Sequence, residues 1–285
     1  MALPRTACVT ILVLLLACSC SEPRDPRRAH ALNESGLALY GQRQFSAALE
    51  DFQDAIRFDP DKAEYWNNAG MARLQLQEFA AATGDFRNAL RIRPAEGLYH
   101  FNLGMAHLSA GAFAPALQAF RQTIRREPDH AEAHFQAGSA AFALKEYGEA
   151  LAHWNKAMTL RPTPMTATRM GALYLSEKRL TESDLWLQRA LGLDPAFPLA
   201  HYNLGVLRRN QGDFARARTH FTAALQGDPG NLPALFNLGL LEAEHGDAAR
   251  ARPLLERFLQ TAPAAMAEQQ GRARRALERL AAGPN

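Results

Sequence analysis

Histidine is the residue type in this sequence with the widest chemical scope, because imidazole binds metal ions and exchanges protons near neutral pH. The chain has 285 residues and nine histidines. His130 and His134 are four residues apart, a spacing that places two ligands on one face of a helix. His130, however, lies in a turn before the helix predicted to hold His134, and no cysteine or carboxylate cluster completes a set of four zinc ligands. The sequence therefore predicts no metal site.

The other ingredients of catalysis are present only as isolated residues. Serine, histidine and aspartate all occur, but no G-x-S-x-G nucleophile motif, phosphate-binding P-loop or G-x-G-x-x-G dinucleotide motif accompanies them. The net charge is +3, with basic and acidic residues interspersed, which does not favour nucleic acid as a partner. We therefore expect no catalytic residue, no cofactor and no small-molecule substrate.

Seven prolines at nearly constant intervals show how the chain is organised. Successive members of this set are separated by 34, 34, 34, 33, 34 and 34 residues. Proline cannot continue a helix and disfavours helical geometry in the residue before it, so each of them ends a helical unit. The seven are Pro60, Pro94, Pro128, Pro162, Pro195, Pro229 and Pro263.

Each unit between these prolines is predicted to hold two amphipathic helices. In residues 198–231, Gly205 lies in the first helix, while Ala217 and Phe221 lie in the second with the spacing of one helix face. A glycine opposite a large side chain lets two helices approach closely. The same glycine recurs as Gly36, Gly70, Gly104, Gly138, Gly171, Gly205 and Gly239. The large side chain recurs as Phe52, Phe86, Phe120, Trp154, Leu187, Phe221 and Leu255.

This pattern resembles the tetratricopeptide repeat, in which W-x2-L-G-x2-Y, A-x3-F and a proline recur over 34 residues. The resemblance implies an all-α solenoid, a right-handed superhelix of seven helix-turn-helix repeats followed by a capping helix in residues 266–285. The seven repeats are predicted over residues 29–62, 63–96, 97–130, 131–163, 164–197, 198–231 and 232–265. His100, His134 and His201 stand where the family pattern has tryptophan, and we interpret them as packing in its place with their polar edge toward water.

The resemblance also implies that a protein partner, as an extended peptide or an amphipathic helix, binds in a concave groove lined by the first helices. The fifth, ninth and twelfth positions of each repeat would face this groove. The residues predicted to bind are Asn67, Met71, Phe101, Met105, Phe135, Phe142, Tyr202, Arg209 and Phe236. Ordinary packing between repeats is the alternative interpretation of the same apolar positions.

The N-terminus reads as a lipoprotein signal peptide over residues 1–17. Its apolar run, from Ala7 to Cys18, has 12 residues, too few to cross a membrane as a helix. Leu15-Leu16-Ala17-Cys18 resembles the bacterial lipobox, which implies that Cys18 carries the lipid, with acyl chains such as palmitate. Cys20 is a poorer candidate for the same modification. Ordinary secretory cleavage and an uncleaved anchor remain alternatives.

Residues 18–28 are predicted to form an extended tether, since they include two prolines and several charges. Ser19 follows Cys18 where an aspartate would resemble an inner-membrane retention signal. In a Gram-negative cell this favours the outer membrane, facing the periplasm.

These features together predict a non-enzymatic interaction scaffold of the bacterial cell envelope. The chain resembles two kinds of repeat lipoprotein, the type IV pilus pilotins, which assist assembly of a secretin, and adaptors that organise peptidoglycan hydrolases. A soluble repeat adaptor without a lipid anchor is a third possibility.

Overall fold

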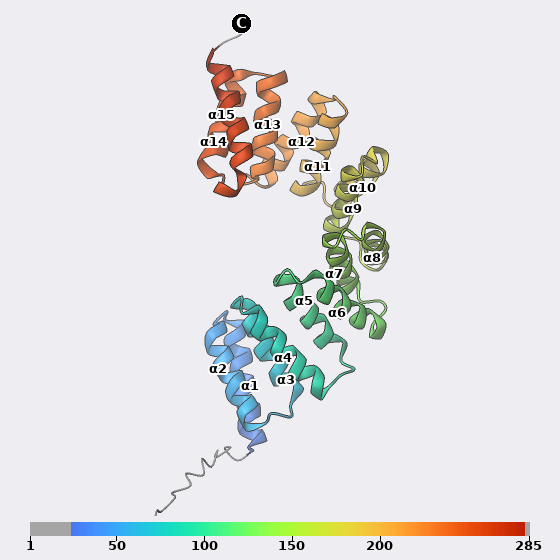
Figure 1. The fold of residues 1–285 in the computed structure, drawn as a ribbon, viewed down its shortest axis with the longest axis vertical. Helices are drawn as coiled ribbons and strands as arrows, with labels where there is room; N and C mark the ends of the chain where they lie inside the picture. The colour runs from blue at the N-terminus through green and yellow to red at the C-terminus, as the bar shows by residue number, and fades with distance from the viewer. Residues whose placement is uncertain (1–23, 283–285) are drawn as a thin grey trace, which may run out of the picture. The chain divides into compact units, whose positions relative to one another are not determined.

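The computed structural model describes residues 24–282, and over this range the chain is helical (Figure 1). These residues form α1 to α15 and one short 3-10 helix, with no β-strand among them, which confirms the predicted all-α class. None of their helices is long and apolar enough to span a membrane. The predicted signal peptide and Cys18 lie outside the described residues. The described residues form two compact units, residues 24–94 and 95–282.

The first unit contains two helix pairs, α1 (Pro26–Gly41) with α2 (Phe45–Phe58) and α3 (Ala63–Gln75) with α4 (Phe79–Ile92). The start of α1 corrects the predicted tether, whose last three residues are helical rather than extended. Asp25 explains this early start, because its carboxylate accepts hydrogen bonds from the backbone N–H groups of Arg27 and Arg28 at 3.2 and 3.0 Å. Proline also suits the first position of a helix, where no N–H is needed.

The second unit contains five helix pairs and a final helix that packs against α13 and α14. Its elements are α5 (Gly97–Ser109), α6 (Phe113–Arg126), α7 (Ala131–Ala143), α8 (Tyr147–Leu160), α9 (Pro164–Ser176), α10 (Leu180–Leu193), α11 (Pro198–Asn210), α12 (Phe214–Gly227), α13 (Leu232–His245), α14 (Ala248–Thr261), a 3-10 turn (Ala264–Met266) and α15 (Ala267–Ala282).

The two helices of a repeat meet where the sequence places a glycine opposite a large side chain. A Cβ on Gly205 of α11 would lie 2.5 Å from the ring of Phe221 on α12. A Cβ on Gly104 would lie 2.6 Å from Phe120. Both rings are fully buried. Glycine is therefore required by close packing, and the recurring glycine sets the distance between the helices of each pair.

A buried ion pair in the first unit gives a titration that can be measured. Asp85 of α4 is 4% exposed and receives a 2.6 Å hydrogen bond from Arg73 of α3. Burial raises the pKa of Asp85 from 3.8 to about 6, and the opposing effect of Arg73 is smaller. Since the folded pKa lies above the unfolded one, the contribution of this group to stability is full below about pH 4 and is lost as the pH rises through 6.

We expect a carbon-13 NMR titration of the Asp85 carboxyl group to show a midpoint near 6. The Arg73→Leu variant should move this midpoint upward, because the nearest cation is then absent. A wild-type midpoint below the ordinary 3.8 would show that Arg73, rather than burial, dominates.

Candidate protein-binding surface

The two predicted groove residues of the first unit lie on α3 and contact each other. Asn67 is 4% exposed, and its side-chain Nδ2 lies 3.5 Å from Sδ of Met71 and 3.4 Å from Oδ1 of Asn68. Met71 is half-buried. Most of the Asn67 side chain is therefore occupied inside the unit, and Met71 is the more accessible of the two.

In the second unit, three of the predicted groove residues pack partly against the core. The ring of Phe101 stacks on His130 with 5.0 Å between centroids, and Met105 is half-buried against the same cluster. Phe142 is 38% exposed, with its ring 5.7 Å from that of Tyr147. Of these three, Phe142 offers the most surface to a partner.

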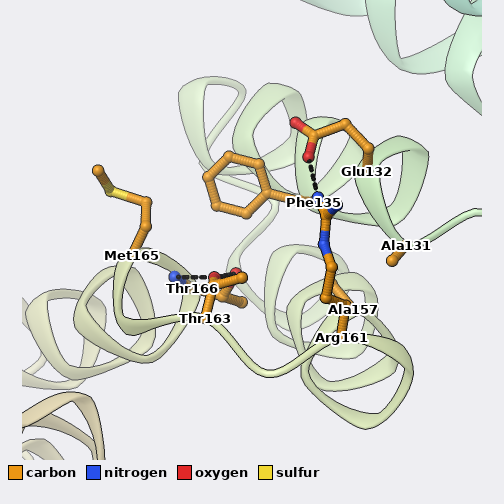
Figure 2. A pocket seen from close by; sticks show the side chains of 8 residues that line it. All are labelled: Ala131, Glu132, Phe135, Ala157, Arg161, Thr163, Met165 and Thr166. Carbon is orange, nitrogen blue, oxygen red and sulfur yellow. Dashed lines mark hydrogen bonds and ion pairs between the residues drawn. The ribbon is translucent and has the colours of Figure 1, made fainter. Parts of the chain in front are cut away.

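Phe135 lines a cavity of about 200 Å³ between α7, α8 and α9 (Figure 2). Pro164 and the capping residue Thr163, whose hydroxyl accepts from the N–H of Thr166 at 3.1 Å, fix the start of α9 beside it. The cavity is lined by Ala131, Glu132, Phe135, Ala157, Arg161, Thr163, Met165 and Thr166.

The walls of this Phe135 cavity are mainly apolar, while an ion pair lies at one side. Arg161 Nη2 is 2.8 Å from Glu132 Oε2, and Figure 2 shows the ring of Phe135 between this pair and Met165. Small-molecule sites usually have volumes of about 300–1,000 Å³. The smaller Phe135 cavity has the size and polarity to accept one apolar side chain of a partner.

A second cavity, of about 250 Å³, has a different chemistry because two guanidinium groups line it. Arg209 of α11 donates to Oδ1 of Asn237 on α13, and the guanidinium of Arg272 on α15 lies 5.3 Å from the ring centroid of Phe236. Phe236 itself is 6% exposed. The lining residues are Arg209, Phe214, Asn237, Leu240, Leu241, Glu244, His245 and Arg272.

Tyr202 contacts a residue that lines this arginine-lined cavity, since its hydroxyl lies 3.4 Å from Nδ2 of Asn237, and its half-buried ring is 6.1 Å from that of Phe221. Asn237 Nδ2 also donates to the carbonyl of Pro233 at 2.8 Å. The amide is thereby held with its oxygen toward Arg209. The sequence prediction included Arg209, Tyr202 and Phe236 but missed Arg272, which belongs to the capping helix.

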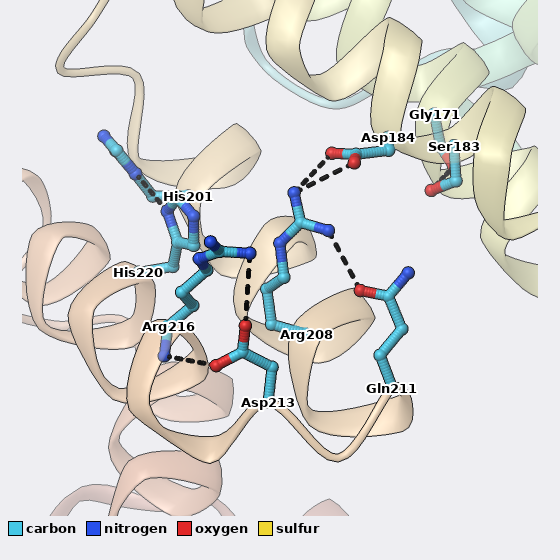
Figure 3. A network of polar contacts seen from close by, with 9 residues as sticks. All are labelled: Gly171, Ser183, Asp184, His201, Arg208, Gln211, Asp213, Arg216 and His220. Carbon is cyan, nitrogen blue, oxygen red and sulfur yellow. Dashed lines mark hydrogen bonds and ion pairs between the residues drawn. The ribbon is translucent and has the colours of Figure 1, made fainter.

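Two adjacent arginines of α11 have different partners. Nη2 of Arg208 donates to both carboxylate oxygens of Asp184 on α10, at 2.7 and 2.9 Å, and Nη1 donates to Gln211 at 2.9 Å (Figure 3). Among the described residues, Arg209 contacts the neutral amide of Asn237 but forms no ion pair with a carboxylate. Arg208 therefore serves packing between helices, whereas Arg209 retains a charge that a ligand could neutralise.

Solved structures of other proteins share this fold. A tetratricopeptide repeat protein from Parabacteroides merdae aligns with a TM-score of 0.69 at 15% identity, over 90% of this chain and all of that one. The Pseudomonas aeruginosa protein pilF aligns with a TM-score of 0.62 at 16% identity, over 73% of this chain and 95% of its own.

A crystal structure of the APC/C hetero-tetramer Cut9-Hcn1 gives a TM-score of 0.66 at 17% identity, and the match covers 90% of this chain but 48% of that one. A comparison of the sequence with curated proteins gives no match. The tetratricopeptide repeat model matches residues 33–97, 68–123, 101–163, 184–232 and 202–266, which is more than half of the sequence. The chain belongs to the tetratricopeptide repeat family, and this membership supports a protein-interaction scaffold.

Proposed function

We propose that the protein is a scaffold of the bacterial cell envelope, anchored through a lipid on Cys18, that binds a segment of a partner protein along the first helices of its repeats. The Phe135 cavity carries this proposal, because it offers an apolar recess of single-side-chain size beside a predicted groove residue. The arginine-lined cavity complements it with cationic groups.

The chemistry of the two cavities defines the partner segment. An apolar side chain would fill the Phe135 cavity, and a carboxylate would lie near Arg209 and Arg272, where two cations outnumber the single carboxylate of Glu244. The segment would be an extended peptide or an amphipathic helix. Phe142 and Met105 would supply additional apolar contact, and methionine adapts readily to differently shaped partners.

We further propose that the protein acts at the outer membrane, facing the periplasm, where it would assist assembly of a pilus or secretion complex. The lipobox-like residues before Cys18 and the sequence resemblance to pilotins support this role; the likeness to pilF concerns the fold alone. An adaptor for peptidoglycan hydrolases is the second candidate, and a soluble adaptor without lipid is the third.

Crosslinking and affinity capture from intact cells tests partner binding. Met165→Glu places a charge in the wall of the Phe135 cavity and should reduce the captured partner by about tenfold or more, equivalent to about 1.4 kcal/mol. Leu185→Glu is the matched control, because Leu185 is 67% exposed and lies outside the cavity. Equal capture by the two variants would contradict binding at this cavity. Capture of a secretin would favour the role in pilus assembly. Capture of cell-wall hydrolases would favour the peptidoglycan hydrolase adaptor.

Mass spectrometry of the mature protein tests the anchor separately. We expect an acylated N-terminal cysteine in the wild type and in Cys20→Ala, but not in Cys18→Ala. Acylation that persists in Cys18→Ala and disappears in Cys20→Ala would show that Cys20 carries the lipid. A wild type without acyl chains would favour the soluble adaptor.

A further inference from the structure

Two pairs of histidines connect the helices of two repeats in the same way. Nδ1 of His134 on α7 lies 3.1 Å from Nδ1 of His153 on α8. In the sixth repeat, Nδ1 of His201 on α11 lies 3.1 Å from Nδ1 of His220 on α12, a pair visible in Figure 3. Both pairs have a spacing of 19 residues, and their members occupy equivalent repeat positions.

The two rings of each pair meet edge to edge, with one Nδ1 atom pointing at the other. Their centroids are 5.4 Å apart in both cases, and this distance exceeds the 3.1 Å between nitrogens by about two ring radii. The two nitrogens therefore lie close to the line that joins the centroids. This geometry suits an N–H···N hydrogen bond with one shared proton, rather than two lone pairs converging on a metal ion.

Backbone carbonyls determine which ring donates that proton. Nε2 of His134 lies 3.0 Å from the carbonyl oxygen of Pro128, and Nε2 of His201 lies 2.9 Å from that of Pro195. Trp66 donates its indole N–H to Pro60 in the same way, at 2.8 Å. Because a carbonyl only accepts, His134 and His201 carry their hydrogen on Nε2 and accept on Nδ1 when neutral.

The partner rings must then donate from Nδ1, and each neutral pair contains one hydrogen between its two nitrogens. A first added proton can go to Nε2 of His153 or His220 without disturbing this bond. A second added proton would place a hydrogen on both facing Nδ1 atoms. Two donors cannot share that bond, and two adjacent imidazolium charges repel each other, so the rings must separate.

Charged groups surround the fourth-repeat pair from three elements. Oε1 of Glu149 on α8 lies 3.4 Å from Nε2 of His153, and this carboxylate also receives Arg121 of α6 at 2.6 Å. Lys156 of α8 pairs with Asp129 of the preceding turn at 2.9 Å, and both of these charges act on His134, as does His130. Glu149 thus favours the first proton, while burial lowers the pKa of both His134 and His153.

The sixth-repeat pair has the opposite charge at the position of Glu149, which here holds Arg216. Arg208 of α11 adds a second cation, and Asp184 of α10 opposes both. Burial, followed by His201 and Arg208, lowers the pKa of His220. The pair of the sixth repeat should therefore resist its first proton more strongly than the pair of the fourth.

We propose that the two histidine pairs are acid-sensitive latches, which join the first and second helices of the fourth and sixth repeats at neutral pH and separate when both rings are protonated. His134 directly precedes Phe135, and α7 and α8 form two walls of the Phe135 cavity. Acidification would therefore loosen this cavity. That consequence for partner binding rests on the proposed function, whereas the latch itself does not.

The seventh repeat shows which residues can replace a histidine pair without introducing a titratable group. In the seventh repeat, the same two positions hold Leu235 and Leu254, which pack in one apolar cluster. The test variant therefore replaces all four latch histidines with leucine (H134L, H153L, H201L and H220L). His30→Gln is the control, since His30 is exposed and lies in the other unit.

The first test is the tautomeric state of the wild-type rings, measured by nitrogen-15 NMR at about pH 7.5, above the usual titration range of histidine. We expect His153 and His220 to carry hydrogen on Nδ1, and His134 and His201 to carry it on Nε2. Hydrogen on Nε2 in all four rings would overturn the proposal. This measurement requires no substitution, so it tests the hydrogen bond within each pair even if the leucine variant fails to fold.

The second test compares urea unfolding midpoints of the full chain at about pH 7.5 and about pH 5, which bracket the histidine titration range. Acidification should lower the urea midpoint of the wild type and that of His30→Gln by the same amount. It should lower the midpoint of the four-leucine variant by at most about half as much, and this remaining decrease comes from carboxylates, which still titrate in this range. An equal loss in all three proteins would overturn the latch. Neither test involves a partner, so the proposed function is judged separately by capture.

Discussion

Replacing Phe221 by alanine is expected to lower the free energy of unfolding by about 3–5 kcal/mol, the usual cost of removing a buried aromatic ring. The side chain is fully buried in a cluster with Ala217, Leu238 and Leu241. Gly205 contributes no side chain that could move into the space. The substitution therefore leaves a cavity between α11, α12 and α13 that the backbone cannot easily close.

Urea unfolding of the full chain, followed by circular dichroism, measures this effect. Phe120→Ala should give a loss of similar size, because Phe120 occupies the same place opposite Gly104. Leu185→Ala is the control, and since Leu185 is 67% exposed its effect should stay within about 0.5 kcal/mol. A loss below about 1 kcal/mol for Phe221→Ala would be incompatible with a cavity of this kind.

Arg218→Ala is the second substitution with a large expected effect. It should lower the free energy of unfolding by about 3–5 kcal/mol, because it leaves a buried carboxylate without its cation. Glu242 of α13 is 3% exposed, and Arg218 of α12 donates to its two oxygens at 2.6 and 3.2 Å. The backbone N–H of Asp247 donates a third hydrogen bond at 3.3 Å. This remaining donor is neutral and cannot replace the guanidinium.

A double variant separates the burial of charge from the loss of packing. Arg218→Met combined with Glu242→Leu removes both charges and should recover most of the stability lost in Arg218→Ala. Arg250→Ala is the control, because its pair with Asp247 is exposed, at 3.9 Å, and should contribute about 1 kcal/mol or less. If Arg218→Ala is as mild as Arg250→Ala, the buried carboxylate must be stabilised in another way.

The spacing of glycines and large apolar residues was sufficient to predict how the helices of each repeat meet. The contact of Gly205 with Phe221 depends on residues within one repeat and on the regular geometry of two helices, both of which the sequence contains. The family match then confirms the repeat, and the described helices confirm the all-α class.

Contacts that depend on how neighbouring helices pack were harder to predict from the sequence. Met165 and Arg272 line cavities because α9 and α15 follow their neighbours at particular distances, which no local pattern encodes. The interpretation that His134 turns its polar edge to water was wrong, since His134 is 7% exposed and faces His153. The recurring 19-residue spacing of histidines was the signal available for that contact.

The groove itself stays a prediction. Positions five, nine and twelve include buried residues such as Asn67 and Phe236 as well as exposed ones such as Phe142. Repeat position alone does not determine exposure, because a side chain that reaches a neighbouring helix becomes part of the interior. Phe135 and Arg209 are the predicted residues that line cavities, and for this reason they carry the proposed binding role.

The two positions that hold a histidine pair in the fourth repeat hold Trp66 and Asp85 in the second and Leu235 and Leu254 in the seventh. The same backbone thus accepts an aromatic ring with a carboxylate, two imidazoles or two aliphatic chains. The pH dependence of stability can accordingly be set one repeat at a time, through substitutions at these two positions.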